Sequence, residues 1–280
     1  MPDLPSNETV LVAAANAAYA RAGMADNWLR SVRQAGVQNP VHLYALSKKT
    51  QRILERQGIE SRLWVDTQGA ITQRQPEFRS KAWKRLVLCK LALIHAELKA
   101  GHQVLYSDLD ACFLRNPVDW LERCTPADGI SVQSDFLLAQ AESVGRLCTG
   151  FMFLKPGPRT LRVMDLNRDD VEAFPSDQPL LNDRMLTRQE APVVRIDLDL
   201  IPNGPHWRRQ GAQLRESAAV LHLSYVLGLQ QKIKFFRNAG LWQTPHGRLE
   251  YLRLRARGHW KQLRKQPSFY LQSLRRQFAV

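Results

Sequence analysis

Cysteine is scarce in this sequence, and its spacing excludes two common ways of stabilising a small protein. The four cysteines are Cys89, Cys112, Cys124 and Cys148, with no C-x-x-C pair and no histidine cluster at zinc-finger spacing. A chain of 280 residues can bury a substantial core without disulfides or a structural metal. We therefore expect free thiols and a reducing compartment.

Long apolar runs are also missing. No stretch of 18 apolar residues occurs, so we expect no membrane-spanning helix. The first residues carry no basic segment, and the apolar stretch from Val10 to Ala20 is interrupted by Asn16, so we expect no secretory signal peptide. The composition is 44% hydrophobic and 24% charged, which excludes collagen, coiled coils and wholesale disorder. These features together predict a cytoplasmic location.

Acidic residues are few relative to basic ones, and the imbalance is local. The sequence has 26 acids against 40 Lys and Arg, for a net charge of +14. Residues 244–280 carry nine basic residues and one acid, which is +8 of that total. Leucines and aromatics interleave with these bases, so we predict a basic helical tail. It either lies on an anionic membrane, at its inner face, or packs on the main domain, residues 1–243. No nucleic-acid-binding motif accompanies the charge, so we expect no nucleic-acid partner.

Apolar periodicity predicts an α/β fold. Strands at 10–15, 41–46 and 61–66 alternate with helices at 25–35 and 48–57, a pattern typical of a parallel sheet covered by helices. A long helix at 80–100 precedes a strand at 103–107. Further strands are expected at 129–135, 150–155, 193–201 and 218–223, and a further helix at 177–187.

Two carboxylates, Asp108 and Asp110, directly follow the predicted strand at 103–107. Ligands of open α/β sheets bind at the carboxyl ends of strands, and hard cations such as Mg²⁺ and Mn²⁺ prefer oxygen ligands. The D-x-D spacing alone is weak evidence for a metal site, because a chain with 15 aspartates in 280 residues is expected to contain such a pair by chance. A second pair, Asp197 and Asp199, is interpreted as polar positions alternating along a half-exposed strand. The surrounding sequence therefore has to show which of the two aspartate pairs is the metal site.

That context resembles the core of the GT-A-fold nucleotide-sugar glycosyltransferases. Residues 101–117 fit the G-x-x-V-L-x-x-D-x-D pattern, with its later proline, of the nucleotide-diphospho-sugar transferase family that includes plant rhamnogalacturonan xylosyltransferases. The glycogenin-like family is a more distant resemblance. Other family segments match in chain order: Asn27-Trp28-Leu29, 129–135, 149–154, Asp177-Gln178 to Asn182, and Leu221-His222 to Trp242. The resemblance covers about residues 9–243. It implies a GT-A-like, Rossmann-type mixed sheet flanked by helices.

The resemblance also implies an activity and a site. A sugar would pass from a nucleotide diphosphate, a UDP-sugar, to a hydroxyl of a glycan or lipid-linked acceptor, with retention of configuration. Residues that match family positions would hold Mn²⁺ or Mg²⁺ (Asp108, Asp110, His222), bind the nucleotide (Ala14, Ala15, Asn16, Asp108, Gly228, Lys232), or face the sugar or acceptor (Asp135, Asp177, Gln178).

Two positions depart from the family pattern. Cys148 stands where the family strand carries Asn, and the second strand ends in Leu46-Ser47 where the family often has Asp. A contact to the sugar or acceptor is therefore lost or altered, and the sequence leaves the donor sugar open.

Other interpretations of the same residues remain. Asp108 and Asp110 also resemble the nucleophile and acid/base pair of haloacid-dehalogenase-type phosphatases, but those place the pair on the first strand. A catalytically inactive GT-A-like binding module is a third alternative, against which intact Asp110 and His222 argue. Taken singly, several residues have structural alternatives: His222 as a core residue, Lys232 as a solvated one, Asp135 as a strand end, Asp177 as a helix cap and His206 as a loop residue.

Overall fold

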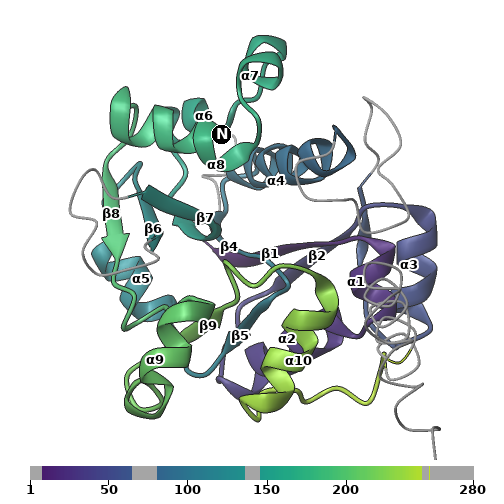
Figure 1. Ribbon diagram of the computed structural model, residues 1–280. Coiled ribbons are helices and arrows are strands. Elements are labelled where there is room, and N and C mark those ends of the chain that lie inside the picture. The colour runs from purple at the N-terminus through teal and green to yellow at the C-terminus, as the bar shows by residue number, and fades with distance from the viewer. Residues whose placement is uncertain (1–7, 65–80, 136–145, 248–251, 253–280) are drawn as a thin grey trace, which may run out of the picture.

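Seven strands form a mixed sheet in the computed structural model, which describes residues 8–64, 81–135, 146–247 and 252 (Figure 1). The strand order is β3-β2-β1-β4-β7-β6-β8, and β5 pairs with β9 in a separate two-stranded sheet. The strands are β1 (Thr9–Ala15), β2 (Val41–Ala45), β3 (Arg62–Leu63), β4 (Gln103–Ser107), β5 (Ala111–Phe113), β6 (Ile130–Asp135), β7 (Arg146–Leu154), β8 (Val193–Ile196) and β9 (Val220–His222).

The direction of pairing changes halfway across the sheet. β3, β2, β1 and β4 are parallel, β7 runs antiparallel to β4 and to β6, and β8 is parallel to β6. The parallel arrangement predicted from the strand and helix alternation therefore holds for the first four strands. The mixed sheet implied by the resemblance describes the seven-stranded sheet as a whole.

Helices cover both faces of the sheet. They are α1 (Ala17–Arg21), α2 (Met24–Gln34), α3 (Lys48–Glu55), α4 (Lys81–Lys99), α5 (Val118–Cys124), α6 (Pro158–Met164), α7 (Arg168–Ala173), α8 (Asp177–Asn182), α9 (Gly204–Leu214) and α10 (Leu229–Asn238). A π-helical turn, η1 (Asp183–Thr187), continues α8. Figure 1 shows α4, α6 and α8 on one side of the sheet and α2, α9 and α10 on the other.

One predicted strand is too long. The strand expected at 193–201 ends at Ile196, because the Asp197 side chain accepts a hydrogen bond from the Asp199 backbone N–H at 2.8 Å and closes a turn. Asp197 and Asp199 are thus turn residues, and the prediction that they alternate along a strand was wrong.

The two faces of β1 build two separate cores, because successive side chains of a strand point to opposite faces. Leu11 and Ala13 belong to the core beneath α2, while Val10 and Val12 belong to the core beneath α4. The four cysteines are free, as predicted from their number and spacing.

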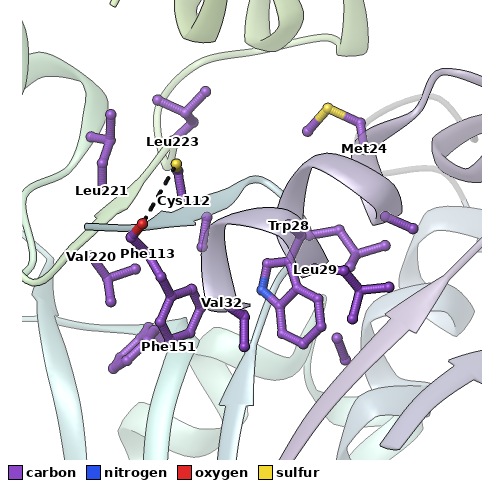
Figure 2. Close-up of a cluster of buried hydrophobic side chains, with 14 of the residues drawn as sticks. Met24, Trp28, Leu29, Val32, Cys112, Phe113, Phe151, Val220, Leu221 and Leu223 are labelled. Carbon is purple, nitrogen blue, oxygen red and sulfur yellow. Dashed lines mark hydrogen bonds between the residues drawn. The ribbon is translucent and has the colours of Figure 1, made fainter. Parts of the chain in front are cut away.

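Trp28 anchors the first core. It is fully buried, and its ring packs edge-on against Phe113 with 6.1 Å between ring centroids (Figure 2). Its indole N–H donates to Ser107 Oγ at 3.2 Å, at the last residue of β4. The same tryptophan therefore holds β5 against α2 and fixes the end of β4.

Residues 243–247 pack on α2. The Gln243 backbone N–H donates to Asn27 Oδ1 at 2.7 Å, and Thr244 Oγ1 bonds Asp26. The rest of the predicted tail, apart from Leu252, lies outside the described residues, so its helical form and its contact with a membrane stay predictions, as does the cytoplasmic location. None of the helices in the described part of the chain has both the length and the apolar composition to cross a membrane.

A buried carboxylate ties β2 to α4. Glu97 is 3% exposed; its two carboxylate oxygens each lie 2.7 Å from a histidine nitrogen, of His42 and of His102, and Tyr44 donates to it as well. The Arg62 guanidinium lies 3.5 Å away. Although the histidines and Glu97 are close enough to share an ion, these donors already satisfy the carboxylate, so we interpret the cluster as structural.

This cluster makes stability depend on acid pH. Burial alone would raise the pKa of Glu97, but the hydrogen bonds from His42, Tyr44 and His102 outweigh it and lower the pKa from 4.5 to about 2. A carboxyl with a lowered pKa stabilises the fold above its unfolded value, here 4.5, and that contribution is lost as the pH falls toward the folded value. Its size is on the order of 3 kcal/mol.

We predict that Glu97→Gln flattens the acid limb of the stability curve. The variant is less stable than wild type at neutral pH, but it loses less free energy of unfolding between pH 4.5 and about 2. Urea unfolding at a series of pH values measures this. Parallel acid limbs in the two proteins would show that Glu97 does not carry the effect.

Candidate active site

The turn between β4 and β5 places Asp108 and Asp110 where the two sheets meet. The Asp108 backbone N–H donates to the carbonyl of Gly150 on β7 at 2.8 Å. β5 then leaves the main sheet and pairs antiparallel with β9, with Ala111 opposite His222. This register brings His222 beside carboxylates more than a hundred positions earlier in the chain.

The three predicted metal ligands form one cluster. His222 Nε2 lies 3.6 Å from Asp110 Oδ1 and 3.9 Å from Asp108 Oδ2. Asp110 and His222 are buried, while Asp108 is partly open to solvent. Two carboxylates and one imidazole are a donor set that suits Mn²⁺, and Mg²⁺ less well because it favours oxygen. The residues present therefore fit the divalent cation that the sequence predicts.

Gly150 makes room for this cluster. A Cβ on Gly150 would lie 2.2 Å from His222 Cε1 and 2.8 Å from Asp108 Oδ2. Glycine at this position on β7 thus lets an imidazole ring lie directly against the strand backbone.

Lys232 supplies a positive charge at the same cluster. Its Nζ pairs with Asp110 and lies 3.4 Å from the Tyr19 hydroxyl. Burial alone would raise the pKa of Asp110, but Lys232 and His222 outweigh it and hold that pKa far below its usual range. Burial would likewise lower the pKa of Lys232, yet Asp110 raises it above its usual value. Both groups are therefore charged at neutral pH.

The groups around His222 favour its charged form. Burial opposes the charge, but the neighbouring Cys148 and Asp110 raise the pKa of His222 to about 10. A cation bound by Nε2 has to displace that proton.

A second set of charges lies near the cluster and lines the same site. Lys90 is buried on α4, pairs with Asp177, and donates to the Thr149 carbonyl and hydroxyl oxygens at 3.1 Å each. Burial would lower the pKa of Lys90, but Asp177 raises it. The next residue of α8, Gln178, donates through its side-chain amide to Asp135 Oδ2 at 2.6 Å. A hydrogen bond thus joins Asp135 and Gln178, two of the three residues predicted to face the sugar or acceptor, while the third, Asp177, bonds Lys90 and Thr149.

A cavity of about 1170 Å³ is lined by residues of both sets. Ala14, Asn16, Gly228 and Lys232 line it, together with the ligand cluster and the wall of Asp135, Asp177 and Gln178. Ala15 does not: its side chain points to the opposite face of β1 and is fully buried in the core beneath α2. Successive side chains of a strand point to opposite faces, so Ala15 points away from the cavity that Ala14 lines.

Several cavity residues were given no role or only a weak one by the sequence. Tyr106 donates to Asp108 Oδ1 at 2.7 Å, and its position two residues before Asp108 on the same strand face was a usable signal. Lys90 was given no specific role; its position three residues after Val87 and four before Ile94, on the apolar face of the helix predicted at 80–100, was the available clue. Thr149 was included only as the first residue of the matched segment 149–154, and Tyr225 carried no local signal.

His206, another residue considered from the sequence, is not part of the cavity lining. His206 is in the first turn of α9, where its backbone N–H donates to the Asn203 side chain at 2.9 Å, so it is not a loop residue. Its ring pairs with Asp199 at 2.7 Å.

The mixed sheet and the cavity with its cluster of Asp108, Asp110 and His222 can now be compared with known proteins. The sequence model of the family described as nucleotide-diphospho-sugar transferase matches residues 36–236. The chain belongs to that family. This membership does not favour the phosphatase alternative for Asp108 and Asp110.

Two curated relatives of this nucleotide-diphospho-sugar transferase come from Arabidopsis thaliana. The beta-arabinofuranosyltransferase RAY1 is 25% identical over 85% of the chain and 48% of its own length. UDP-D-xylose:L-fucose alpha-1,3-D-xylosyltransferase 3 is 24% identical over 87% of the chain and 70% of its own length. The chain thus spans about half of the first relative and a larger share of the second.

Solved structures share the fold. The galactosyltransferase LgtC, in complex with donor and acceptor sugar analogues, matches 84% of the chain and 96% of its own at a TM-score of 0.51 and 14% identity. The bifunctional glycosyltransferase WbbM matches 90% of the chain and 52% of its own at a TM-score of 0.56 and 11% identity. The architecture is therefore that of GT-A glycosyltransferases.

We predict that Gly150→Ala abolishes Mn²⁺ binding while the fold persists, because the added methyl occupies the space of the His222 ring. Electron paramagnetic resonance of free Mn²⁺ measures binding, and circular dichroism measures folding. Gly36→Ala is the control: a methyl there meets nothing within 4 Å although φ is +76°, so it lowers stability and leaves Mn²⁺ binding intact. Unchanged Mn²⁺ affinity in Gly150→Ala would contradict the assigned ligand geometry.

Proposed function

We propose that this protein transfers a sugar from a nucleotide diphosphate donor, a UDP-sugar, to a hydroxyl of a glycan or lipid-linked acceptor, with the help of Mn²⁺ or Mg²⁺. One observation carries the proposal. The same cavity is lined by a divalent-cation donor set with a partly buried lysine, here called its first wall, and by a hydrogen-bonded carboxylate and amide, here called its second wall.

The first wall suits a diphosphate. α10 begins directly after Gly228, which lines the cavity and has no side chain with which to cap the helix. The first N–H groups of a helix lack intrahelical partners and attract phosphate oxygens. Lys232 adds a positive charge one turn into the same helix. We assign Gly228 and Lys232 to the diphosphate, and Ala14 and Asn16 to the nucleoside end of the donor.

The ligand cluster completes that wall. Asp108, Asp110 and His222 would hold the cation, which, when bound, supplies a Lewis acid for the departing diphosphate. Lys232 then moves from Asp110 to a phosphate oxygen, so that its charge stabilises the negative charge that develops as the sugar leaves.

The second wall suits a sugar. Asp135, Gln178 and Asp177 offer hydrogen-bond acceptors and donors at fixed positions, because Gln178 holds Asp135 and Lys90 holds Asp177. In the reaction, the bond between the anomeric carbon and the diphosphate oxygen breaks with its electron pair on that oxygen. The acceptor oxygen bonds to the anomeric carbon and gives its proton to the departing diphosphate.

Retention of configuration is supported by the carboxylates. Inverting transfer uses a carboxylate that is available as a general base on the face opposite the leaving group. Each of the four carboxylates that the structure places on the cavity lining has a hydrogen-bond or ion-pair partner: Asp108, Asp110, Asp135 and Asp177. We therefore propose attack on the face from which the diphosphate leaves.

We predict that wild type binds UDP in a metal-dependent way and that Asp110→Asn does not. The substitution removes a ligand charge and leaves Lys232 without its partner. Isothermal titration with and without Mn²⁺ measures the binding. UDP-D-xylose is the first donor to test for slow hydrolysis, because it appears in the name of a relative.

Asp199→Asn is the matched control for this measurement. It removes the charge of Asp199, which belongs to the other D-x-D pair. The Asp199 side chain is 64% exposed and contacts His206. The variant should bind UDP and Mn²⁺ as wild type does. If wild type binds neither UDP nor GDP nor dTDP, with any metal, the proposal fails. Binding without turnover of any sugar nucleotide would instead indicate an inactive binding module.

The stereochemical prediction is separate. The product glycoside has the anomeric configuration of the donor sugar, and proton NMR of the first product formed reads the coupling of its anomeric proton. An inverted product would require a free base and would contradict the role given to the partnered carboxylates.

A further inference from the structure

The ring of His222 is held from both sides. Nε2 faces Asp108 and Asp110, whereas Nδ1 lies 2.7 Å from Gln133 Oε1 on β6. Gln133 is fully buried. The Cys148 sulfur is also near Nδ1, at the longer distance of 3.7 Å.

A second hydrogen bond fixes which end of the Gln133 amide faces the ring. Its Nε2 donates to the backbone carbonyl of Ile201 at 2.9 Å. A carbonyl can only accept, so the amide nitrogen points to Ile201 and the amide oxygen must point to His222. An amide oxygen also only accepts, and therefore Nδ1 carries a proton. Nε2, on the side of the two carboxylates, is then the nitrogen that would bind a cation in place of its proton.

An irregularity in the sheet brings Gln133 to this position. Along β6, Val132 pairs with Met152 of β7, but the next residue, Gln133, pairs with Cys148. The register shift places extra residues of β7, including Gly150, between these two pairs. Bulges of this kind redirect side chains. The same irregularity thus presents the Gln133 amide and the glycine surface against which His222 lies.

We propose that Gln133 is a positioning residue: it holds the Nδ1–H tautomer and the orientation of His222, and so sets the metal affinity of the Asp108–Asp110–His222 cluster. The inference rests on the proposed function, because it assumes that this cluster binds Mn²⁺. Partners of metal-ligating histidines typically contribute about 10- to 100-fold in affinity, and Gln133→Met should lose that much.

The experiment is a titration of Mn²⁺ alone, followed by electron paramagnetic resonance, into full-length wild type and three variants. Gln133→Met keeps the length of the side chain and removes the acceptor, so it should bind Mn²⁺ about 10- to 100-fold more weakly. Gln133→Glu keeps an acceptor for the Nδ1–H and should bind closer to wild type. This rescue separates positioning from packing, which both variants disturb.

Ser131→Ala is the matched control. Ser131 is fully buried on the same strand, but its hydroxyl bonds Thr125 at 2.7 Å. Removing it disturbs β6 without touching His222. It should lower the melting temperature and leave Mn²⁺ affinity unchanged. Melting temperatures of all four proteins show whether a loss of Mn²⁺ affinity goes together with a loss of stability.

Each result decides the inference. Gln133→Met with wild-type affinity overturns it alone, because the metal site then exists and does not depend on the amide. Gln133→Glu as weak as Gln133→Met also overturns it, because the acceptor is then not what matters. Wild type that binds UDP but no Mn²⁺ overturns the metal part of the proposed function, and the role of Gln133 with it.

Discussion

The pairing of β5 with β9 is the constraint on which the site depends. The two strands are three residues long each and place Ala111 opposite His222. A two-stranded ribbon of that length is not stable by itself. It persists here because Cys112, Phe113 and Val220 are buried in the core beneath α2, where Trp28 packs on Phe113 (Figure 2). The hydrophobic burial of a small two-stranded sheet thus sets the spacing of Asp108, Asp110 and His222.

Charge compensation is the second constraint. Asp110 with Lys232, and Asp177 with Lys90, are ion pairs that line one cavity; Lys232 is partly buried and the other three residues are buried. An unpaired charge in such a place costs several kcal/mol, so each pair holds its partners in a fixed place until a ligand offers a replacement. Under the proposed function, a diphosphate with its cation would offer such a replacement at the first pair, because it would bring both an anion for Lys232 and a cation for Asp110. Binding would then exchange ion pairs without leaving a charge uncovered.

Much of the fold was accessible from local patterns. β1, β2, α2, α3, α4 and β4 follow from apolar periodicity and glycine stops, and they appear where predicted to within one or two residues. α1 and α5 did not, because helices of five and seven residues are too short for a periodic signal. α10 is longer, and its Leu229, Ile233 and Phe236 follow the i, i+4, i+7 spacing of a helix, so a usable periodic signal was missed there. The strand expected at 193–201 failed at Asp197, whose side chain prefers a turn.

The sequence by itself determined which side chains could do the chemistry: a carboxylate pair at a strand end, a histidine in an apolar strand, and their order along the chain. Tertiary structure alone decided their partners. Lys232 meets Asp110 across 122 positions, His222 meets Gln133 across 89, and Lys90 meets Thr149 across 59. Local spacing reports which face of an element is buried. It carries no information on which distant element packs there, and that packing is what holds Asp177 with Lys90 and places Gly150 beneath His222.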